Sequence, residues 1–197
     1  MTVFFHGSFG LNRQRMSGLL MAALKTPDLS DKELAVPFGY NAPFTTRYRS
    51  WLHKTGLTHR GRPLRLTEFG EAIVREDPGL ETIPSMWFMH HELTGNEDRA
   101  EAWDYFANDF LPNHDSFSED ELLAGLTDKL RSHSEQHFGP GSRMNRTIVR
   151  KLIECYTEEQ ALGPLGVLNA NDDGTYTWGK PKELGPWPNP EQLAAAY

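Results

Sequence analysis

The sequence predicts a mainly α-helical protein with small β-hairpins, consisting of an N-terminal winged helix, a helical middle and a second, winged-helix-like C-terminal module. Apolar residues recur at the i, i+3, i+4 spacing of an amphipathic helix along much of the chain. Two Ser-x-x-Glu segments, beginning at Ser30 and Ser118, are typical of helix starts. A helix is twice followed by a short segment with hairpin signals, which is the order of elements in a winged helix.

Two helices and a turn are predicted before residue 42. Residues 8–25 carry an apolar face that includes Met16 and Leu20, and Pro27 ends this helix. The capping box from Ser30 to Glu33 opens a short second helix. Residues 38–41 then form a turn.

The third helix, from about 43 to 55, has the two-faced pattern of a helix that enters the DNA major groove. Its apolar stripe is Phe44, Tyr48, Trp51 and Leu52. We expect the opposite face to meet the bases, through Thr46, Arg49, Ser50 and His53. Asn41 and Thr45 lie near its N-terminus, where backbone amides can meet phosphate.

The segment that follows the third helix predicts the wing of a winged helix. Leu64 and Leu66 alternate with Arg65, Arg60-Gly61 is a hairpin-tip signal, and Thr67 predicts the cap of the next helix. We expect phosphates to be held by Arg47, Lys54, Arg60 and Arg62. Winged helices also bind proteins, so the fold alone does not establish DNA binding.

The formal net charge of −7 is distributed unevenly along the 197 residues. Residues 1–76 hold 11 basic and 6 acidic side chains, and residues 34–67 hold no acid at all. Residues 77–142 hold 3 basic and 14 acidic side chains. The basic part predicts contact with nucleic acid. The acidic part repels phosphate and predicts a basic partner enzyme or a second copy of the chain.

The remaining two thirds of the chain predict helices and a second hairpin. Helices fill about 83–138, with Asn96 as one cap and Ser118 at another helix start. A helix over 145–157 places three arginines on one face, and these are secondary candidates for DNA binding: Arg143, Arg146 and Arg150. Residues 164–178 predict a hairpin with an acidic tip, and residues 181–197 form a Pro-rich tail. The predicted modules are therefore 1–76, 77–180 and 181–197.

The sequence predicts no catalytic residue, cofactor or metal site. His133 and His137 have the i, i+4 spacing of two metal ligands on a helix, but a third ligand is not evident. His90 lies on an apolar face, where a hydrogen-bonded core histidine is the expectation, and the sequence assigns no role to His6. Cys155 is the only cysteine, which excludes an intramolecular disulfide.

The chain is expected to be cytoplasmic. It contains no stretch of about 18 apolar residues that could span a membrane. Its first residues, MTVFFHGSFG, lack the basic and long apolar regions of a signal peptide.

Four groups of residues resemble the bacterial family known as domain of unknown function 4007. They are Phe5-His-Gly-Ser-Phe9 with Leu11; Gly39-Tyr-Asn41 with Arg49-Ser-Trp51-Leu52; Leu66-Thr-Glu-Phe-Gly70 with Asp77-Pro-Gly-Leu-Glu81 and Trp87-x-x-His90; and Ala102-Trp-Asp-Tyr-Phe-Ala-Asn108. The likeness covers about residues 4–170. Gly7 stands where the family usually has Glu, and Asn12 stands near its Arg. The resemblance implies a setting beside sulfur-transfer enzymes, in DNA phosphorothioate modification or anti-phage defence.

Three functions are open at this point. The first is a non-enzymatic DNA-binding protein, an accessory or regulatory subunit of a DNA modification or defence system. The second is a protein-interaction module that docks a partner enzyme through its acidic middle. The third is a metal-dependent hydrolase.

Overall fold

The computed structural model describes residues 3–95 and 97–180, which form two compact units. One unit is residues 11–92, and the other joins residues 3–10 to residues 93–180. We call them the 11–92 unit and the 93–180 unit and treat each by itself. The predicted junction at Asp77-Pro78 lies inside the 11–92 unit. Asn96, predicted as a cap, and the predicted tail at 181–197 lie outside the described residues.

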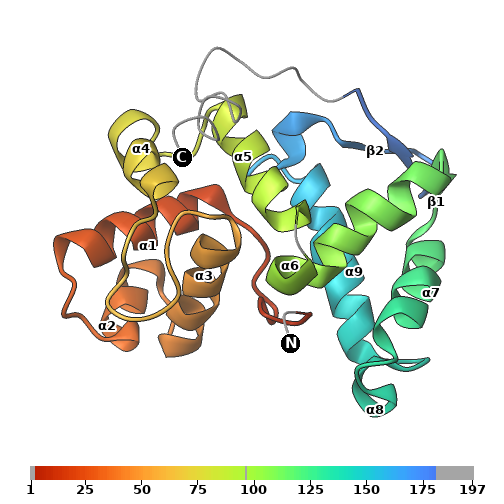
Figure 1. Ribbon diagram of the computed structural model, residues 1–197, viewed down its shortest axis with the longest axis horizontal. Coiled ribbons are helices and arrows are strands. Elements are labelled where there is room, and N and C mark those ends of the chain that lie inside the picture. Colours follow the sequence, from red (N-terminus) through yellow and green to blue (C-terminus); the bar gives the residue numbers. More distant parts are fainter. Residues whose placement is uncertain (1–2, 96, 181–197) are drawn as a thin grey trace. The chain divides into compact units, whose positions relative to one another are not determined.

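The 11–92 unit is helical and is built on α1 (Arg13–Lys25), α2 (Asp31–Ala35) and α3 (Ala42–Lys54), which pack against one another (Figure 1). A 3-10 turn, η1 (Val36–Phe38), links α2 to α3. α4 (Glu68–Glu76) and α5 (Ile83–Thr94) follow, and the boundary between the units falls within α5. The predicted stripe of α3 is buried as expected, with Tyr48, Trp51 and Leu52 each 0% exposed.

The first helix begins later than predicted. The Asn12 side chain accepts a hydrogen bond from the backbone N–H of Arg15, so α1 begins at Arg13 and not near residue 8. An Asn at this position satisfies an N–H group that would otherwise lack a partner at the helix end. The capping box of α2 is present as predicted, with Ser30 and Glu33 bonded to each other's backbone N–H.

The segment after α3 forms less β structure than its sequence predicts. It is closed by one bridge between Thr58 and Leu66 and by a bond from His59 N to Arg65 O of 2.9 Å. Pro63 has no N–H with which to extend such a ladder, and glycine weakens a strand. Thr67 caps α4 as predicted, accepting from Gly70 N at 3.0 Å.

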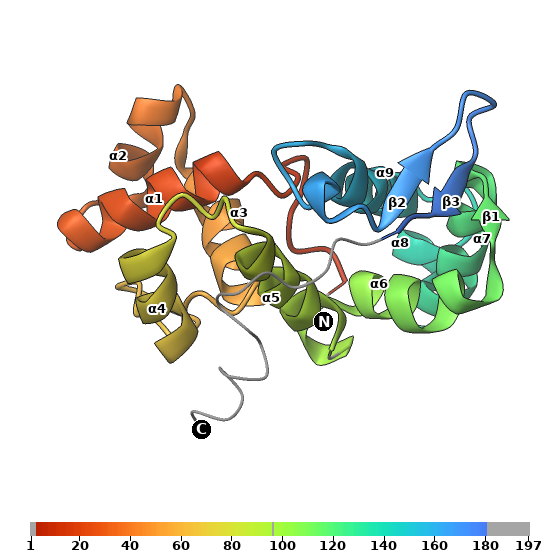
Figure 2. The same cartoon turned by 90° about the horizontal axis from the view of Figure 1, so that it is seen from above.

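The 93–180 unit combines helices with a three-stranded antiparallel sheet. Its elements are α6 (Glu97–Asp104), the π-helical η2 (Tyr105–Phe110), η3 (Leu111–Asn113), β1 (Ser116–Phe117), α7 (Glu119–Leu130), α8 (Glu135–Phe138), α9 (Arg143–Thr157), η4 (Gly163–Leu165), β2 (Leu168–Ala170) and β3 (Tyr176–Trp178). The strand order is β1-β3-β2, with Phe117 opposite Tyr176 and Asn169 opposite Thr177 (Figure 2). β2 and β3 are the predicted hairpin, whereas β1 and η2 were not predicted.

The core of the 93–180 unit forms around aromatic side chains. Trp103 and Tyr156 are 0% exposed, and the rings of Phe106 and Tyr156 stack with centroids 5.6 Å apart. The α7 capping box is present as predicted, with Ser118 and Glu121 bonded to each other's backbone N–H. Among the described helices, none has the length and apolar character needed to cross a membrane.

Candidate nucleic-acid interface

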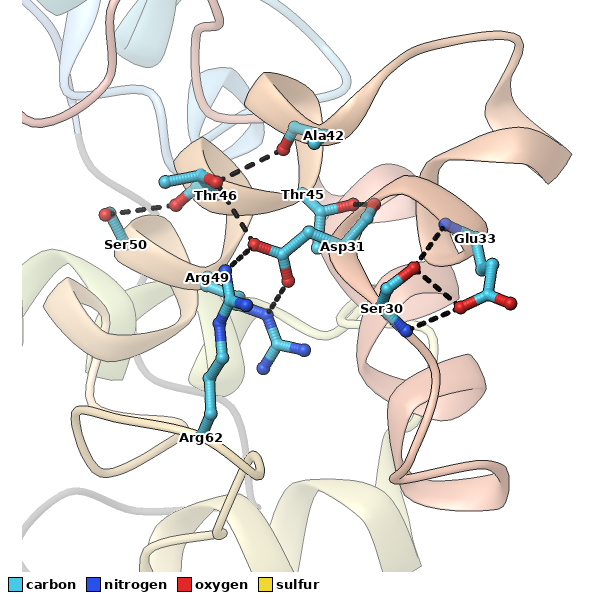
Figure 3. Close-up of polar contacts among 9 residues, drawn as sticks. All are labelled: Ser30, Asp31, Glu33, Ala42, Thr45, Thr46, Arg49, Ser50 and Arg62. Carbon is cyan, nitrogen blue, oxygen red and sulfur yellow. Dashed lines mark hydrogen bonds and ion pairs between the residues drawn. The ribbon is translucent and has the colours of Figure 1, made fainter.

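A buried carboxylate, Asp31, ties three parts of the 11–92 unit together (Figure 3). It is the first residue of α2 and is 5% exposed. Its carboxylate oxygens accept from Arg49 Nε at 2.9 Å and from Thr46 Oγ1 at 3.2 Å, both on α3. The same carboxylate pairs with the guanidinium of Arg62, which lies in the segment after α3. Asp31 therefore fixes residues 58–66 against α2 and α3.

The four residues predicted to face bases are engaged within the unit to different degrees. The Arg49 side chain is 13% exposed and is held by Asp31. Ser50 Oγ donates to Thr46 O at 3.2 Å, and His53 Nδ1 donates to Thr58 O at 3.1 Å. Thr46 itself is exposed. The face is thus hydroxyl-rich, as predicted, but its arginine already has a carboxylate partner.

Two of the predicted contact residues do not present their side chains to solvent. Thr45 is 0% exposed and donates through Oγ1 to the backbone carbonyl of Asp31 at 2.7 Å. Lys54 is 8% exposed, because it lies on the inner side of the last turn of α3. Asn41 is exposed at the start of α3, and Arg47 is half-buried.

The segment after α3 carries three exposed positive charges close together in the sequence, namely Arg60, Arg62 and Arg65. The Arg62 side chain is 63% exposed although one of its nitrogens meets Asp31. Arg65 was not among the predicted contacts. The alternation of Leu64, Arg65 and Leu66 is the signal that would have found it. Successive side chains of an extended segment point to opposite faces, so Arg65 faces away from the two leucines.

A cation and an aromatic ring also lie near the start of α3. The guanidinium carbon of Arg15 lies 5.4 Å from the centroid of the Tyr40 ring, and Nη2 donates to the Tyr40 hydroxyl at 3.3 Å. The Tyr40 ring stacks on Phe44 with centroids 4.8 Å apart. A hydrogen bond to Tyr48 is the main cause of a raised pKa at Arg15. The sequence did not predict this pair, because Arg15 on α1 and Tyr40 before α3 are 25 residues apart.

The secondary candidates lie on α9 of the 93–180 unit. Arg143, Arg146 and Arg150 are all exposed, as the predicted face requires. Arg150 Nε lies 3.6 Å from Glu154 Oε1 on the same helix.

The histidines have structural surroundings. His6 is 0% exposed, with Nδ1 2.8 Å from Gly7 O. Burial, followed by the charge of the neighbouring His91, lowers the pKa of His90 to about 4, so this side chain is neutral at pH 7. His133 and His137 do not share a helix as predicted: His133 lies between α7 and α8. The cause is Ser134, which caps the separate helix α8.

We expect the purified protein to contain well under one equivalent of zinc, iron or manganese by elemental analysis. His133 Nε2 lies 2.7 Å from Glu101 Oε1, and His137 Nδ1 lies 2.9 Å from Ser134 Oγ. No group of three or more His, Cys, Asp or Glu side chains suited to a metal occurs within residues 3–95 and 97–180. A stoichiometric metal that disappears in the His133→Ala, His137→Ala double variant would contradict this expectation.

Comparison with known proteins places the chain in a family. No curated protein matches it. Two solved structures resemble it in fold: "SspB crystal structure", at 17% identity and a TM-score of 0.71, and "Magnesium ion-bound SspB crystal structure", at 16% identity and a TM-score of 0.67. Each match covers 93% of this chain and 61% of the other, so the chain spans about three fifths of their length. The family profile "Protein of unknown function (DUF4007)" matches residues 6–173, and the chain belongs to this family.

Proposed function

We propose that this chain is a non-enzymatic DNA-binding protein whose 11–92 unit is a winged helix. In this proposal, α3 enters the major groove and residues 58–66 serve as the wing. The order α1, α2, α3 and a segment closed by the Thr58–Leu66 bridge supports it. The observation that carries it is the exposure of three arginines on residues 58–66, within a stretch of the chain that contains no acid: Arg60, Arg62 and Arg65.

The contacts divide into those that position the protein and those that reach bases. Arg60 and Arg65 are exposed and bind phosphates, since guanidinium groups pair well with phosphate oxygens. Thr46 is the exposed polar side chain on the base-facing side of α3. Arg49 acts mainly as a positioning residue, because its guanidinium is bound to Asp31 and its side chain is 13% exposed.

The biological setting of this activity is a bacterial DNA modification or anti-phage defence system, in which the chain is an accessory or regulatory subunit. The family to which the chain belongs and its likeness in fold to proteins named SspB support this setting. The acidic segment at 77–142, with 14 acidic and 3 basic side chains, then serves to dock a basic partner enzyme or a second copy of the chain.

We expect the full chain to bind a duplex of about 20 base pairs with log K falling against log salt at a slope of roughly −3 to −4, as about four neutralised phosphates require. The Arg60→Glu, Arg65→Glu variant should reduce the magnitude of this slope by about two. The matched control is Lys25→Glu, Arg75→Glu, which reverses two exposed charges of the same unit outside the acid-free stretch. Fluorescence anisotropy over graded salt measures both.

The comparison of the two variants decides whether the site assignment is right. If both double variants weaken binding equally, only net charge matters and residues 58–66 are not the wing. If the unmodified chain does not bind DNA even at about 50 mM salt, the proposed function is wrong.

A further inference from the structure

The 93–180 unit has the element order of a second winged helix. α6 and η2 precede β1, α7 and α9 follow, and β2 and β3 form the closing hairpin. β1 pairs with β3 and not with β2, so a strand lying between the first and second helices completes the sheet beside the hairpin (Figure 2). If α6 with η2 is taken as the first helix and α7 as the second, and the four-residue α8 belongs to their connection to α9, then α9 has the position of the third helix of a winged helix, which reads DNA.

Buried polar contacts fix the start of α9. Asn145 is 0% exposed, and its Nδ2 donates to Thr127 Oγ1 of α7 at 3.0 Å and to Phe138 O of α8 at 2.7 Å. Ser142 caps the helix, with Oγ accepting from Met144 N at 3.1 Å and from Asn145 N at 3.2 Å. α9 is thus held to both preceding helices at its N-terminal end, the end that contacts bases in a helix-turn-helix.

The outer side of α9 is an arginine stripe, which we define as Arg143, Arg146 and Arg150. At about 100° per residue these three positions fall within an arc of roughly 60° and span about 10 Å of the helix axis. All three are exposed, whereas Ile148, Val149 and Leu152 on the inner side are 0% exposed. Arg143 and Arg146 form no side-chain hydrogen bond or ion pair with another residue of the described chain. Among residues 3–95 and 97–180, no carboxylate pairs with either of these two guanidinium groups, whereas Arg49 and Arg62 both pair with Asp31.

The stripe is also a local exception in an acidic unit. Residues 93–180 contain 8 basic and 16 acidic side chains. The hairpin tip carries Asp172 and Asp173, and Asp173 accepts from the N–H and hydroxyl of Thr175 at 2.9 and 2.7 Å, which lowers its pKa. The hairpin tip therefore stays negative and repels phosphate. Within the described part of this unit, the arginine stripe of α9 therefore offers a polyanion three exposed basic side chains on one helix face.

We propose that the arginine stripe of α9 is a second site for duplex DNA, so that the chain contacts DNA with both units. This second site rests on the proposed function, because both assign duplex DNA as the ligand. An α-helix with its side chains is about 10–12 Å wide and fits the major groove of about 12 Å. The stripe contacts the groove edge or its phosphates while the acidic hairpin stays off the backbone. The hairpin of this second winged helix thus does not act as a DNA-binding wing.

The test uses the full chain and a duplex of about 20 base pairs at about 50 mM salt. Four proteins are compared by anisotropy: the unmodified chain, Arg60→Glu/Arg65→Glu, Arg143→Glu/Arg146→Glu, and all four substitutions together. A control, Arg131→Glu/Lys180→Glu, is made both in the unmodified chain and in the Arg60→Glu/Arg65→Glu variant, and reverses two exposed charges of the same unit outside the stripe. Circular dichroism and thermal unfolding establish that each variant folds, and light scattering gives its oligomeric state.

With residues 60 and 65 already reversed, we expect the Arg143/Arg146 reversal to weaken the remaining binding by at least about tenfold and the control reversal by less than about threefold. If the Arg143/Arg146 reversal and the control reversal weaken DNA binding equally, the second site is overturned. If only the Arg60/Arg65 reversal weakens DNA binding, the second site is also overturned, while the proposed function stands. An effect of Arg143/Arg146 alone keeps the α9 site and overturns the assignment to residues 58–66. A stripe reversal that dissociates a dimer without changing DNA affinity overturns the proposal in favour of a second copy as occupant.

Discussion

Replacing Gly70 with alanine is expected to destabilise the 11–92 unit by about 3 kcal/mol or more, a large effect for one methyl group. A Cβ atom at Gly70 would lie 2.0 Å from the carbonyl oxygen of Leu57 and 3.0 Å from its carbonyl carbon. These are backbone atoms that cannot rotate away. Leu57 N donates to Leu52 O at 2.9 Å, and Leu57 O accepts from Thr67 N at 3.2 Å. A shift of Leu57 away from the new methyl group would therefore break backbone hydrogen bonds before and after residues 58–66.

The matched control is Gly18→Ala in α1 of the same unit. There the new Cβ would meet Phe38 ring atoms at 3.0 and 3.1 Å, and a side chain can shift by a few tenths of an ångström. Alanine also favours the helix over glycine by about 1 kcal/mol, so we expect a net change within about 1 kcal/mol. Urea unfolding at equal slope measures both variants. If the two variants unfold at the same urea concentration, the close contact between a Cβ atom at Gly70 and Leu57 does not affect stability.

The helices that carry the candidate sites could be predicted because their signals are local. The apolar stripe of α3 and the caps at Ser30, Thr67 and Ser118 involve residues within one or two turns of one another. The hairpin of β2 and β3 is likewise marked by its own turn at residues 172–174. Each of these elements formed close to the predicted position.

What could not be predicted depends on residues far apart in the sequence. β1 is two residues long and exists because β3, some 60 residues later, pairs with it. The periodicity of α3 placed Arg49 on the outer face, but only the packing of α2 brings the Asp31 carboxylate to it. The break between α7 and α8 follows from a cap at Ser134, which the prediction of His133 and His137 on one helix did not take into account.

Replacing Asp31 with alanine is expected to lower the free energy of unfolding of the 11–92 unit by about 2–3 kcal/mol. Removing one member of a buried ion pair costs about 3–5 kcal/mol. We expect a smaller loss than this for Asp31→Ala, because the Arg62 side chain is 63% exposed and is hydrated again once its partner is removed. The Arg49 side chain is 13% exposed and regains little hydration. A double-mutant cycle with Arg49→Met should therefore show a larger coupling than one with Arg62→Met. The reverse order would contradict this account of the cluster.

The same substitution should strengthen DNA binding by the folded protein, by about three- to tenfold at low salt, because it removes a negative charge that competes with phosphate for Arg62. Glu33→Ala is the control: it removes a carboxylate from the same helix, but one that is exposed and bonded to Ser30. Anisotropy below the unfolding transition compares the two variants. If Asp31→Ala binds more weakly than Glu33→Ala while still folded, Asp31 holds Arg62 in place for DNA and does not compete with it. If it binds more tightly, the carboxylate that stabilises this unit does so at the expense of its affinity for DNA.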